Sequence, residues 1–180
     1  MHTTYLAELV GKCRRVAVFI DGANLARMPT HLGKGEEPGR SVDFQKLKGF
    51  LDSLGRVTIL KYYTARDYDE RVERFFKVLE GFGYQVIHFS TKTFQDGSRK
   101  GNLDSHIMMD TVKEVTTYDT AVIISGDGDF VPCVRYLREH GKRVVILSSQ
   151  HGLAAELRES GAQIVYLDDL KRNLTYLRFR

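Results

Sequence analysis

Residues 121–130 read Ala-Val-Ile-Ile-Ser-Gly-Asp-Gly-Asp-Phe, and this stretch decides how the chain folds. Its first four residues are apolar and mostly β-branched, which predicts a short buried strand. Gly126 and Gly128 are expected to let the backbone turn sharply just after this strand. Ligands bind beyond the carboxyl ends of strands in open α/β sheets. Asp127 and Asp129 lie there, and two carboxylates held so close repel each other unless a cation or a proton lies between them.

A simpler interpretation assigns the second aspartate a purely structural role. Asp129 would cap the helix that follows, with Pro132 in its first turn. This explains one carboxylate and leaves Asp127 without a role. We therefore favour a functional site over a helix cap.

Length and composition are those of an ordinary globular protein. The chain has 180 residues, of which 42% are hydrophobic and 28% charged. We expect a single domain over 1–180, with a core at about 16–169 and a basic C-terminal tail at 170–180. No apolar run reaches membrane-spanning length, and the start of the chain lacks the apolar segment of a secretory signal. We therefore expect no membrane association. Cys13 and Cys133 match no C-x-x-C spacing and are expected to be ordinary small apolar residues, which favours a reduced cytoplasm as the location.

Charge is distributed unevenly along the chain. The net charge is +4, and positive residues gather at 92–100 and 171–180. A solvated surface explains these charges when they are taken alone. If the carboxylates bind metal, however, the remaining surface is more basic than the net charge indicates, which favours nucleic acid as a partner.

Apolar periodicity predicts alternating strands and helices. The strands are expected at 15–20, 56–64, 84–89, 120–124, 142–147 and 164–167, and the helices at 42–54, 68–82, 103–115, 130–139, 153–160 and 168–174. Two polar segments, 26–41 and 90–102, are expected to be long connections. This alternation implies βαβ units with right-handed crossovers. We therefore predict an α/β fold, a three-layer α/β/α sandwich with a mainly parallel sheet of about six strands.

Carboxylates from separate parts of the sequence are expected to meet at one edge of this sheet. Its crevice should open where the strand order reverses, between the first strand and the strand that begins the second half. Asp21 ends the first of these strands, and Asp127 and Asp129 follow the second. Asp104 begins a predicted helix and can point back toward the same edge, although negative charge there also stabilises a helix by itself.

The other acid of that helix is expected to face elsewhere. Asp110 lies about 240° further round the helix than Asp104, at 3.6 residues per turn. We interpret Asp110 as a supporting or structural residue. His106, four residues before it, is its expected partner.

The residue types define the chemistry that such a site could perform. Four carboxylates without histidine or cysteine form an oxygen-only donor set, which suits Mg²⁺ or Mn²⁺ better than zinc. A carboxylate cluster with one or two such ions is suited to hydrolysis of phosphodiester bonds. Lys100 could hold a substrate phosphate, Asn24 could orient a ligand, a water or Asp21, and Ser125 supplies a hydroxyl at the strand end. The simpler alternatives are a solvated lysine for Lys100 and a turn asparagine for Asn24.

Three motifs, in this order, resemble the NYN domain. They read Val-Phe-Ile-Asp-Gly-Ala-Asn at 18–24, Lys-Gly-Asn-Leu-Asp at 100–104 followed by Asp110, and Ser-Gly-Asp-Gly-Asp-Phe at 125–130. The chain is most similar to the LabA branch of this family, within the PIN-like nuclease superfamily. The resemblance covers about 16–169.

The resemblance implies a PIN-like, Rossmann-like α/β/α fold and a metal-dependent ribonuclease site. The metal-binding and catalytic acids that it implies are Asp21, Asp104, Asp127 and Asp129, with Asn24, Lys100 and Ser125 in substrate-binding or supporting positions. The segment 27–40 departs from the family pattern as a long insertion, which could gate the substrate or bind a partner. Homodimers occur in the family, and some members of this branch are described as regulators.

The leading hypothesis is therefore a ribonuclease, acting as an endoribonuclease, that hydrolyses RNA at an Asp-rich Mg²⁺ or Mn²⁺ site. The alternative is a non-catalytic RNA-binding or regulatory module, with an unidentified protein regulator. A small-molecule phosphohydrolase ranks third, because Asp-Gly-Asp also occurs in aspartyl-phosphate enzymes. That mechanism needs an acid two residues after the nucleophile, and Asp21 is followed at that position by Ala23.

Overall fold

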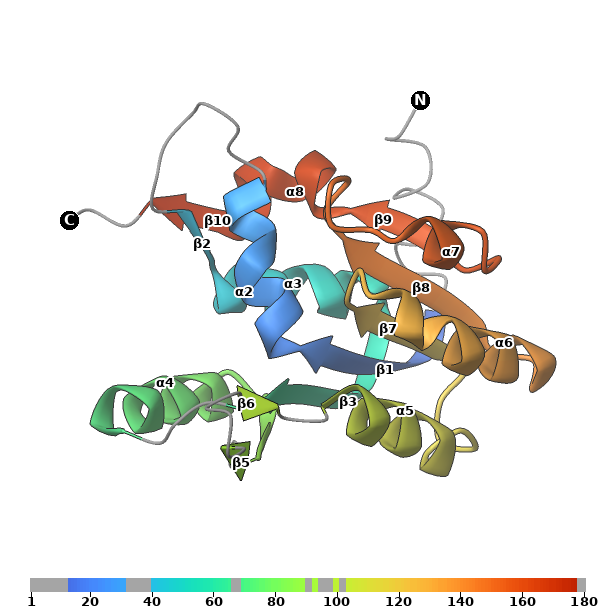
Figure 1. Ribbon diagram of the computed structural model, residues 1–180, viewed down its shortest axis with the longest axis horizontal. Coiled ribbons are helices and arrows are strands. Elements are labelled where there is room, and N and C mark those ends of the chain that lie inside the picture. The colour runs from blue at the N-terminus through green and yellow to red at the C-terminus, as the bar shows by residue number, and fades with distance from the viewer. Residues whose placement is uncertain are drawn as a thin grey trace.

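The computed structural model describes residues 13–31, 40–65, 69–89, 92–93, 99–100 and 103–177 (Figure 1). Its centre is a six-stranded sheet with the order β4-β3-β1-β7-β8-β9, in which every neighbouring pair is parallel. The strands are β1 (Cys13–Asp21), β3 (Gly55–Thr64), β4 (Gln85–His88), β7 (Thr120–Ile124), β8 (Arg143–Ser148) and β9 (Gln163–Tyr166). The prediction of a parallel six-stranded sheet is confirmed.

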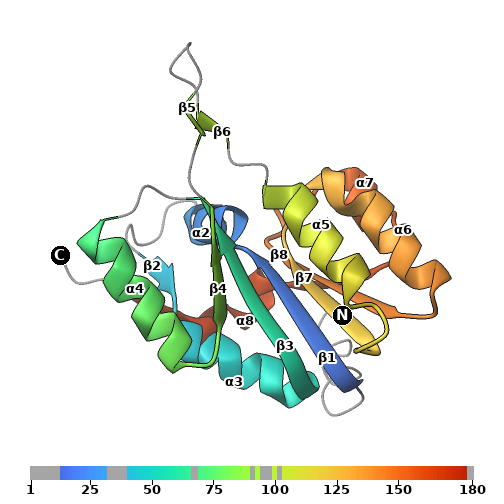
Figure 2. The ribbon, with the colours of Figure 1, turned by 90° about the horizontal axis from the view of Figure 1, so that it is seen from below.

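Helices cover both faces of the sheet, as the crossovers between parallel strands require. They are α2 (Gly22–His31), α3 (Phe44–Leu54), α4 (Glu70–Gly81), α5 (Leu103–Lys113), α6 (Val131–Glu139), α7 (Ala155–Arg158) and α8 (Leu167–Leu174), with a short 3₁₀ helix η1 (Gly128–Phe130) before α6. Figure 2 shows α3, α4 and α8 on one side of the sheet and α5 and α6 on the other. The predicted three-layer sandwich is confirmed.

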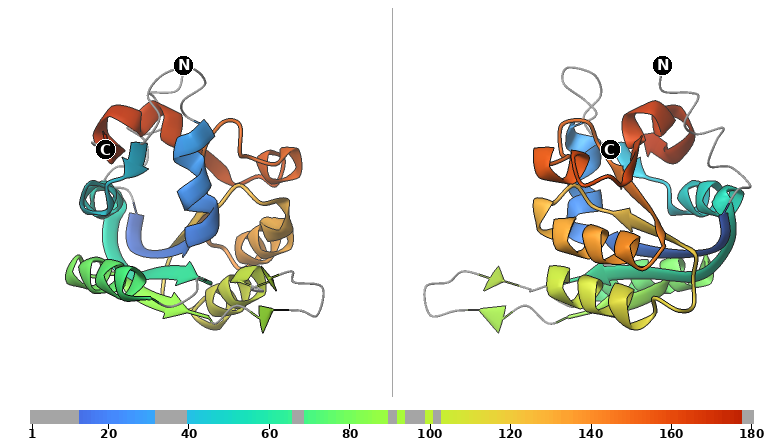
Figure 3. Two further views of the ribbon diagram at one scale, coloured as in Figure 1. Left: turned by 60° about the vertical axis from the view of Figure 1, so that its left-hand side comes forward. Right: turned by 90° about the vertical axis from the view of Figure 1, so that its right-hand side faces the viewer.

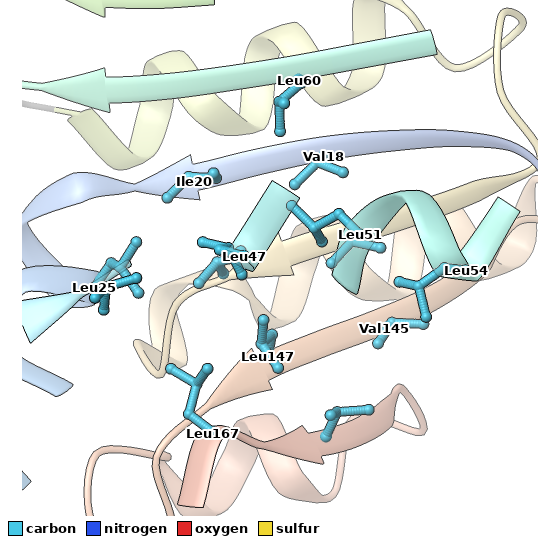
Figure 4. Close-up of a cluster of buried hydrophobic side chains, with 14 of the residues drawn as sticks. Val18, Ile20, Leu25, Leu47, Leu51, Leu54, Leu60, Val145, Leu147 and Leu167 are labelled. Atoms are coloured by element: carbon cyan, nitrogen blue, oxygen red, sulfur yellow. The ribbon is translucent and has the colours of Figure 1, made fainter. Parts of the chain in front are cut away.

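Strand β1 lies in the middle of the sheet and is buried on both faces. Val18 and Ile20 belong to the apolar cluster that α3 and α8 cover, which also contains Leu47 and Leu51 (Figure 4). Phe19 belongs to the cluster on the opposite face, beneath α5 and α6. Alternate residues of a strand point to opposite faces, so the side chain of Asp21 continues the row of Phe19, on the face that α5 covers.

The structure corrects the prediction for the segment 26–41. Helix α2 continues through Pro29 to His31, and β2 (Arg40–Val42) ends the segment, so it is not one continuous loop. Leu25 and Met28, one helical turn apart, are each 1% exposed. Their burial outweighs the loss of one backbone donor at Pro29. Residues 32–39 of the expected loop lie outside the described residues.

The second expected connection also contains regular structure. Strands β5 (Lys92–Thr93) and β6 (Arg99–Lys100) form an antiparallel pair in which Lys92 lies opposite Lys100. Figures 2 and 3 show this pair set apart from the body of the molecule. Residues 90–91, 94–98 and 101–102 lie outside the described part of the chain.

The C-terminal segment also forms regular elements. Strand β10 (Thr175–Leu177) follows α8 and pairs with β2, antiparallel. Part of the segment that we expected to be a basic tail is therefore held by backbone pairing. In the part of the chain that the structure describes, no helix is long and apolar enough to cross a membrane.

Candidate metal centre

The strand order reverses between β1 and β7, where the sequence predicted a crevice. From this pair the chain proceeds outward through β3 and β4 on one side and through β8 and β9 on the other. Ile20 of β1 pairs with Ile124 of β7. Asp21 and Ser125 are the next residues of the two chains, so the register brings them together at the carboxyl edge of the sheet.

Three carboxylates converge above this edge. One oxygen from each of Asp104, Asp127 and Asp129 lies within 4.8 Å of the others. Asp104 is in the first turn of α5, and Asp127 and Asp129 belong to the turn that leads from β7 through η1. Asp104 and Asp127 are partly buried and Asp129 is exposed. Three of the four predicted acids are thus within reach of one cation.

Asp21, the fourth acid, is the most deeply buried and lies outside that group of three. Its carboxylate is 5% exposed. It accepts the backbone N–H of Asn24 at 2.9 Å and the hydroxyl of Ser125 at 3.4 Å. Burial raises the pKa of Asp21, while these donors and the charge of Arg27 act in the opposite direction. Asp21 therefore contributes a fixed, shielded carboxyl group beside the group of three.

The pKa of Asp104 shows how burial and neighbouring carboxylates act together in this centre. Burial, followed by the charges of Asp21, Asp127 and Asp129, raises the pKa of Asp104 to about 6, against the smaller opposing effect of Arg27. Ionising all of these groups together is unfavourable without a compensating positive charge. Such a perturbed carboxylate at a strand-end crevice is typical of functional sites. The oxygen-only donor set fits a hard divalent cation such as Mg²⁺ or Mn²⁺.

Hydrogen bonds hold the acidic turn in place. The Ser125 hydroxyl accepts the N–H of Asp127 at 3.2 Å, and the Asp127 carboxylate accepts the N–H of Asp129 at 3.0 Å. The Asn24 side-chain oxygen accepts the N–H of Gly126 at 3.1 Å, which ties the end of β1 to the turn after β7. Asn24 and Ser125 thus bind the backbone of this turn, and their supporting role at the site stays a prediction.

The helix cap in this turn is not the residue that the simpler interpretation named. Asp127, not Asp129, is the N-cap of η1, and Phe130 occupies the N-cap position of α6 without a side-chain hydrogen bond. Pro132 lies in the first turn of α6, as predicted. The exposed carboxylate of Asp129 has no capping role there.

The glycines of the turn serve a different purpose from the one predicted. Among the described glycines, positive φ angles occur at Gly83, Gly141 and Gly161. Gly126 needs no such angle, but a Cβ atom there would lie 2.0 Å from the carbonyl oxygen of Gly152. Gly128 is less constrained, since its nearest neighbour would be the Ala154 Cβ at 3.4 Å. Close packing against the loop after β8, and not a left-handed turn, requires glycine at 126.

Comparison with known proteins agrees with this geometry. The NYN domain matches residues 15–168. This chain belongs to the NYN domain family. It is 28% identical over 163 residues to the Low amplitude and bright protein LabA of Synechococcus elongatus, a match that covers 87% of this chain and 86% of that protein. It is therefore an NYN protein of the LabA type.

Two further relatives extend the comparison. An uncharacterized protein of Methanocaldococcus jannaschii is 22% identical over 157 residues, and the match covers 86% of this chain but 56% of that protein. The crystal structure of a protein of unknown function from Vibrio parahaemolyticus superposes with a TM-score of 0.79 at 21% identity, covering 92% of this chain and 98% of the other. At this identity the second comparison supports the fold of the NYN domain alone.

Asp110, the other acid of the central motif, belongs to a separate cluster. Its carboxylate accepts the Tyr63 hydroxyl at 2.7 Å and the Lys61 ammonium at 3.0 Å. Lys61 also donates to Glu114, the residue that follows the end of α5. Burial acts to raise the pKa of Asp110, but the hydrogen bonds from Tyr63 and Lys61 outweigh it and lower the pKa. The expectation that Asp110 faces away from the acid cluster agrees with these contacts.

The expected partner of His106 and the expected role of Lys100 have different outcomes. His106 stacks on Phe89, with ring centroids 4.2 Å apart, while Asp110 binds residues of β3, so the expected pairing of His106 with Asp110 is wrong. Lys100 lies in β6, opposite Lys92. Only its backbone is among the described parts, so its role toward a substrate phosphate stays a prediction.

A cavity of about 440 Å³ adjoins the acidic turn that carries Asp127. Two residues that line it were not predicted from the sequence. They are Arg27 and His151, and Asp127 lines the same cavity. Arg27 lies one helical turn after Asn24 in α2. Reading 22–31 as a helix would have revealed its position, but Pro29 led us to expect a loop there.

Proposed function

We propose that this NYN domain is a Mg²⁺- or Mn²⁺-dependent endoribonuclease, and that Asp21, Asp104, Asp127 and Asp129 form its centre. The convergence of three carboxylate oxygens within 4.8 Å carries this proposal. These residues come from different elements, at the edge of an α/β sheet where ligands bind. Membership of the NYN family, within the PIN-like nuclease superfamily, supports the same assignment.

The four acids of the centre have two different tasks in this proposal. Asp104, Asp127 and Asp129 hold the divalent cation through their oxygens. When bound, the cation activates a water and neutralises the negative charge that develops on the phosphate during hydrolysis. Asp21 stays buried beside them and keeps its orientation through Asn24 and Ser125.

Substrate binding draws on positive charge around the centre. Lys100 precedes Asp104 by one short connection, and we assign it to a phosphate of the RNA. Arg27 brings a second positive charge near the acids, since it opposes the rise in the pKa of Asp104. An RNA backbone needs such compensation to approach a cluster of carboxylates.

Metal-dependent cleavage tests the proposal directly. Linear and circular labelled RNAs would be incubated with wild-type protein in Mg²⁺, Mn²⁺ or EDTA. We expect metal-dependent cutting of both, because only internal cleavage opens a circle. Asp127→Asn should reduce the rate by about 100-fold or more, as loss of a metal-site residue does.

The substitution is suited to this test because asparagine retains an oxygen that can accept the N–H of Asp129. Its melting temperature should therefore stay close to that of wild type. Asp52→Asn, an exposed change on α3, is the matched control and should cut RNA normally. Absence of cleavage together with salt-dependent RNA binding would instead establish a non-catalytic binding module.

A further inference from the structure

The cavity beside the acid cluster is a second feature of the same sheet edge. It lies between α2 and the loop that follows β8, and its polar lining includes Arg27 and His151. Met28 and Leu153 belong to the same lining, but both side chains are buried. Asp127 is the one acid of the cluster that also lines the cavity, so a ligand in it lies directly beside the proposed metal centre.

Hydrogen bonds hold the wall of this cavity in a defined position. The N–H of Ala154 donates to the carbonyl of Gly126 at 2.9 Å, and the N–H of Gly152 donates to the Ser149 hydroxyl at 3.0 Å. The N–H of Gln150 donates to the carboxylate of Asp168 at 2.8 Å, at the start of α8. The loop that carries His151 is thus fixed at three points, and the cavity is preformed.

The opposite wall is equally well anchored. Met28 is 1% exposed and packs into the core, so the position of its neighbour Arg27 on α2 is set by that packing. Asn24, one turn earlier, binds the N–H of Gly126. The same residue therefore orders the acidic turn and the helix that presents the arginine.

The lining combines the groups that a nucleotide needs. A guanidinium binds phosphate oxygens in a fork of two hydrogen bonds. The exposed imidazole of His151 can stack on the flat face of a base or form hydrogen bonds with a base or a sugar. The volume of about 440 Å³ is in the range of sites for small organic ligands.

We propose that this cavity is a subsite for a single nucleotide, with its phosphate on Arg27 and its base against the exposed side chain of His151. This proposal rests on the proposed ribonuclease function, because the nucleotide is taken to be part of the RNA strand that passes over the acids. The nucleotide held here adjoins the phosphodiester bond to be cut. It therefore sets the position of the strand, and Arg27 acts in binding and not in the chemical step.

Binding of mononucleotides tests the cavity independently of cleavage. Adenosine and uridine 5′-monophosphates contain no internucleoside bond to cut, so their affinity for the full chain in Mg²⁺ buffer reports on the subsite alone. Arg27→Gln should weaken this binding about tenfold or more, the effect of losing one charged hydrogen-bond pair. Ala154→Leu, which adds volume inside the cavity, should weaken it by another route. Arg56→Gln, an exposed change at the amino end of β3, is the matched control and should bind normally.

Steady-state cleavage of a short oligoribonucleotide supplies the second readout. Arg27→Gln and Ala154→Leu should raise KM with little change in kcat, and Arg27→Lys should restore part of the lost affinity because it retains the charge without the fork. The same oligoribonucleotide should displace a bound mononucleotide. Failure of this competition would overturn the assignment to the RNA strand and leave a site for a free nucleotide.

The two proposals fail in different ways. In one case the protein cuts RNA in a metal-dependent way, neither cavity variant changes KM, and no mononucleotide binds. This result would overturn the subsite and retain the ribonuclease. A different result would be a protein that cuts no RNA but binds mononucleotides, with weaker binding in both Arg27→Gln and Ala154→Leu. This result would overturn the ribonuclease and, with it, the assignment of the nucleotide to an RNA strand.

Discussion

Helix α5 carries two aspartates with opposite electrostatic surroundings. Asp104, in its first turn, faces other carboxylates, and its pKa is raised to about 6. Asp110, six residues later, receives hydrogen bonds from Tyr63 and Lys61, and its pKa is lowered. Both side chains are partly buried. The difference teaches that burial and like charges raise the pKa of an acid unless hydrogen bonds and a neighbouring cation outweigh them, as Tyr63 and Lys61 do at Asp110.

The largest expected effect comes from removing the cation of the second cluster. Lys61→Met leaves Asp110 and Glu114 as neighbouring charges without their shared ammonium, which is itself largely buried. We expect a loss of about 2–3 kcal/mol in the free energy of unfolding, because an unpaired charge in a partly buried site is costly. The melting temperature should fall by about 5–10 °C in a calorimetric scan.

Lys48→Met is the control for this substitution. Lys48 pairs with Asp52 on the surface of α3, where an ion pair contributes little. Equal losses for the two lysine variants would show that the cluster around Asp110 is no more than a surface pair, and the contrast between the two aspartates would fail.

A smaller effect is expected from the hydroxyl that also binds Asp110. Tyr63 is fully buried, and burial followed by its hydrogen bond to Asp110 raises its pKa. Tyr63→Phe should cost about 1.5 kcal/mol, the contribution of a hydrogen bond to a charged group. A double-mutant cycle with Asp110→Asn, followed by denaturant unfolding, isolates the pair. Additive losses would mean that the hydroxyl acts through packing and not through Asp110.

The smallest expected effect has the opposite sign. Asp104→Asn removes a carboxylate that its neighbours repel, so in EDTA at pH 7.5 it should stabilise the protein by about 1 kcal/mol, after allowance for screening at this half-exposed group. The melting temperature should rise by about 3 °C. Excess Mn²⁺ should reverse this order, since only the wild type retains the full ligand set and gains stability by binding.

The stability gained by Asp104→Asn should depend on pH, because the pKa of Asp104 is raised in the folded protein. Between about pH 4 and pH 6 the folded protein binds a proton at Asp104 that the unfolded chain has already released, so the wild type loses stability as the pH rises through this window. The advantage of Asp104→Asn should be complete above pH 6 and vanish below about pH 4. A variant that is less stable than wild type in EDTA at pH 7.5 would show that Asp104 supports the fold, as Asp110 does.

The sheet and the position of the centre could be predicted from sequence because few arrangements satisfy the pattern. Six apolar strands that alternate with helices admit one main architecture, and parallel strands place Asp21 and Asp127 at the same edge. Asp104 could also be placed near this edge, because its position at the start of a predicted helix lets its side chain point back toward the strand ends. These inferences need only local patterns and the handedness of the crossovers.

The partners of the charged residues could not be predicted in the same way. Lys61 and Tyr63 meet Asp110 only because α5 packs over β3, which depends on how distant side chains fit together. Arg27 was missed because Pro29 indicated a loop, whereas burial of Met28 extends the helix. Gly126 was correctly singled out for the wrong reason, since its neighbour Gly152 lies far along the sequence.

The pairing of β1 with β7 also determines when the centre can exist. Asp21 is made early in synthesis, yet its neighbours at the sheet edge arrive only after β3, β4 and α5 have been completed. Parallel pairing across so long an interval is a late event in folding. A nascent chain, or a proteolytic fragment that ends before Gly128, therefore cannot assemble the acid group. The acid group is assembled only in molecules whose sheet is complete through β7.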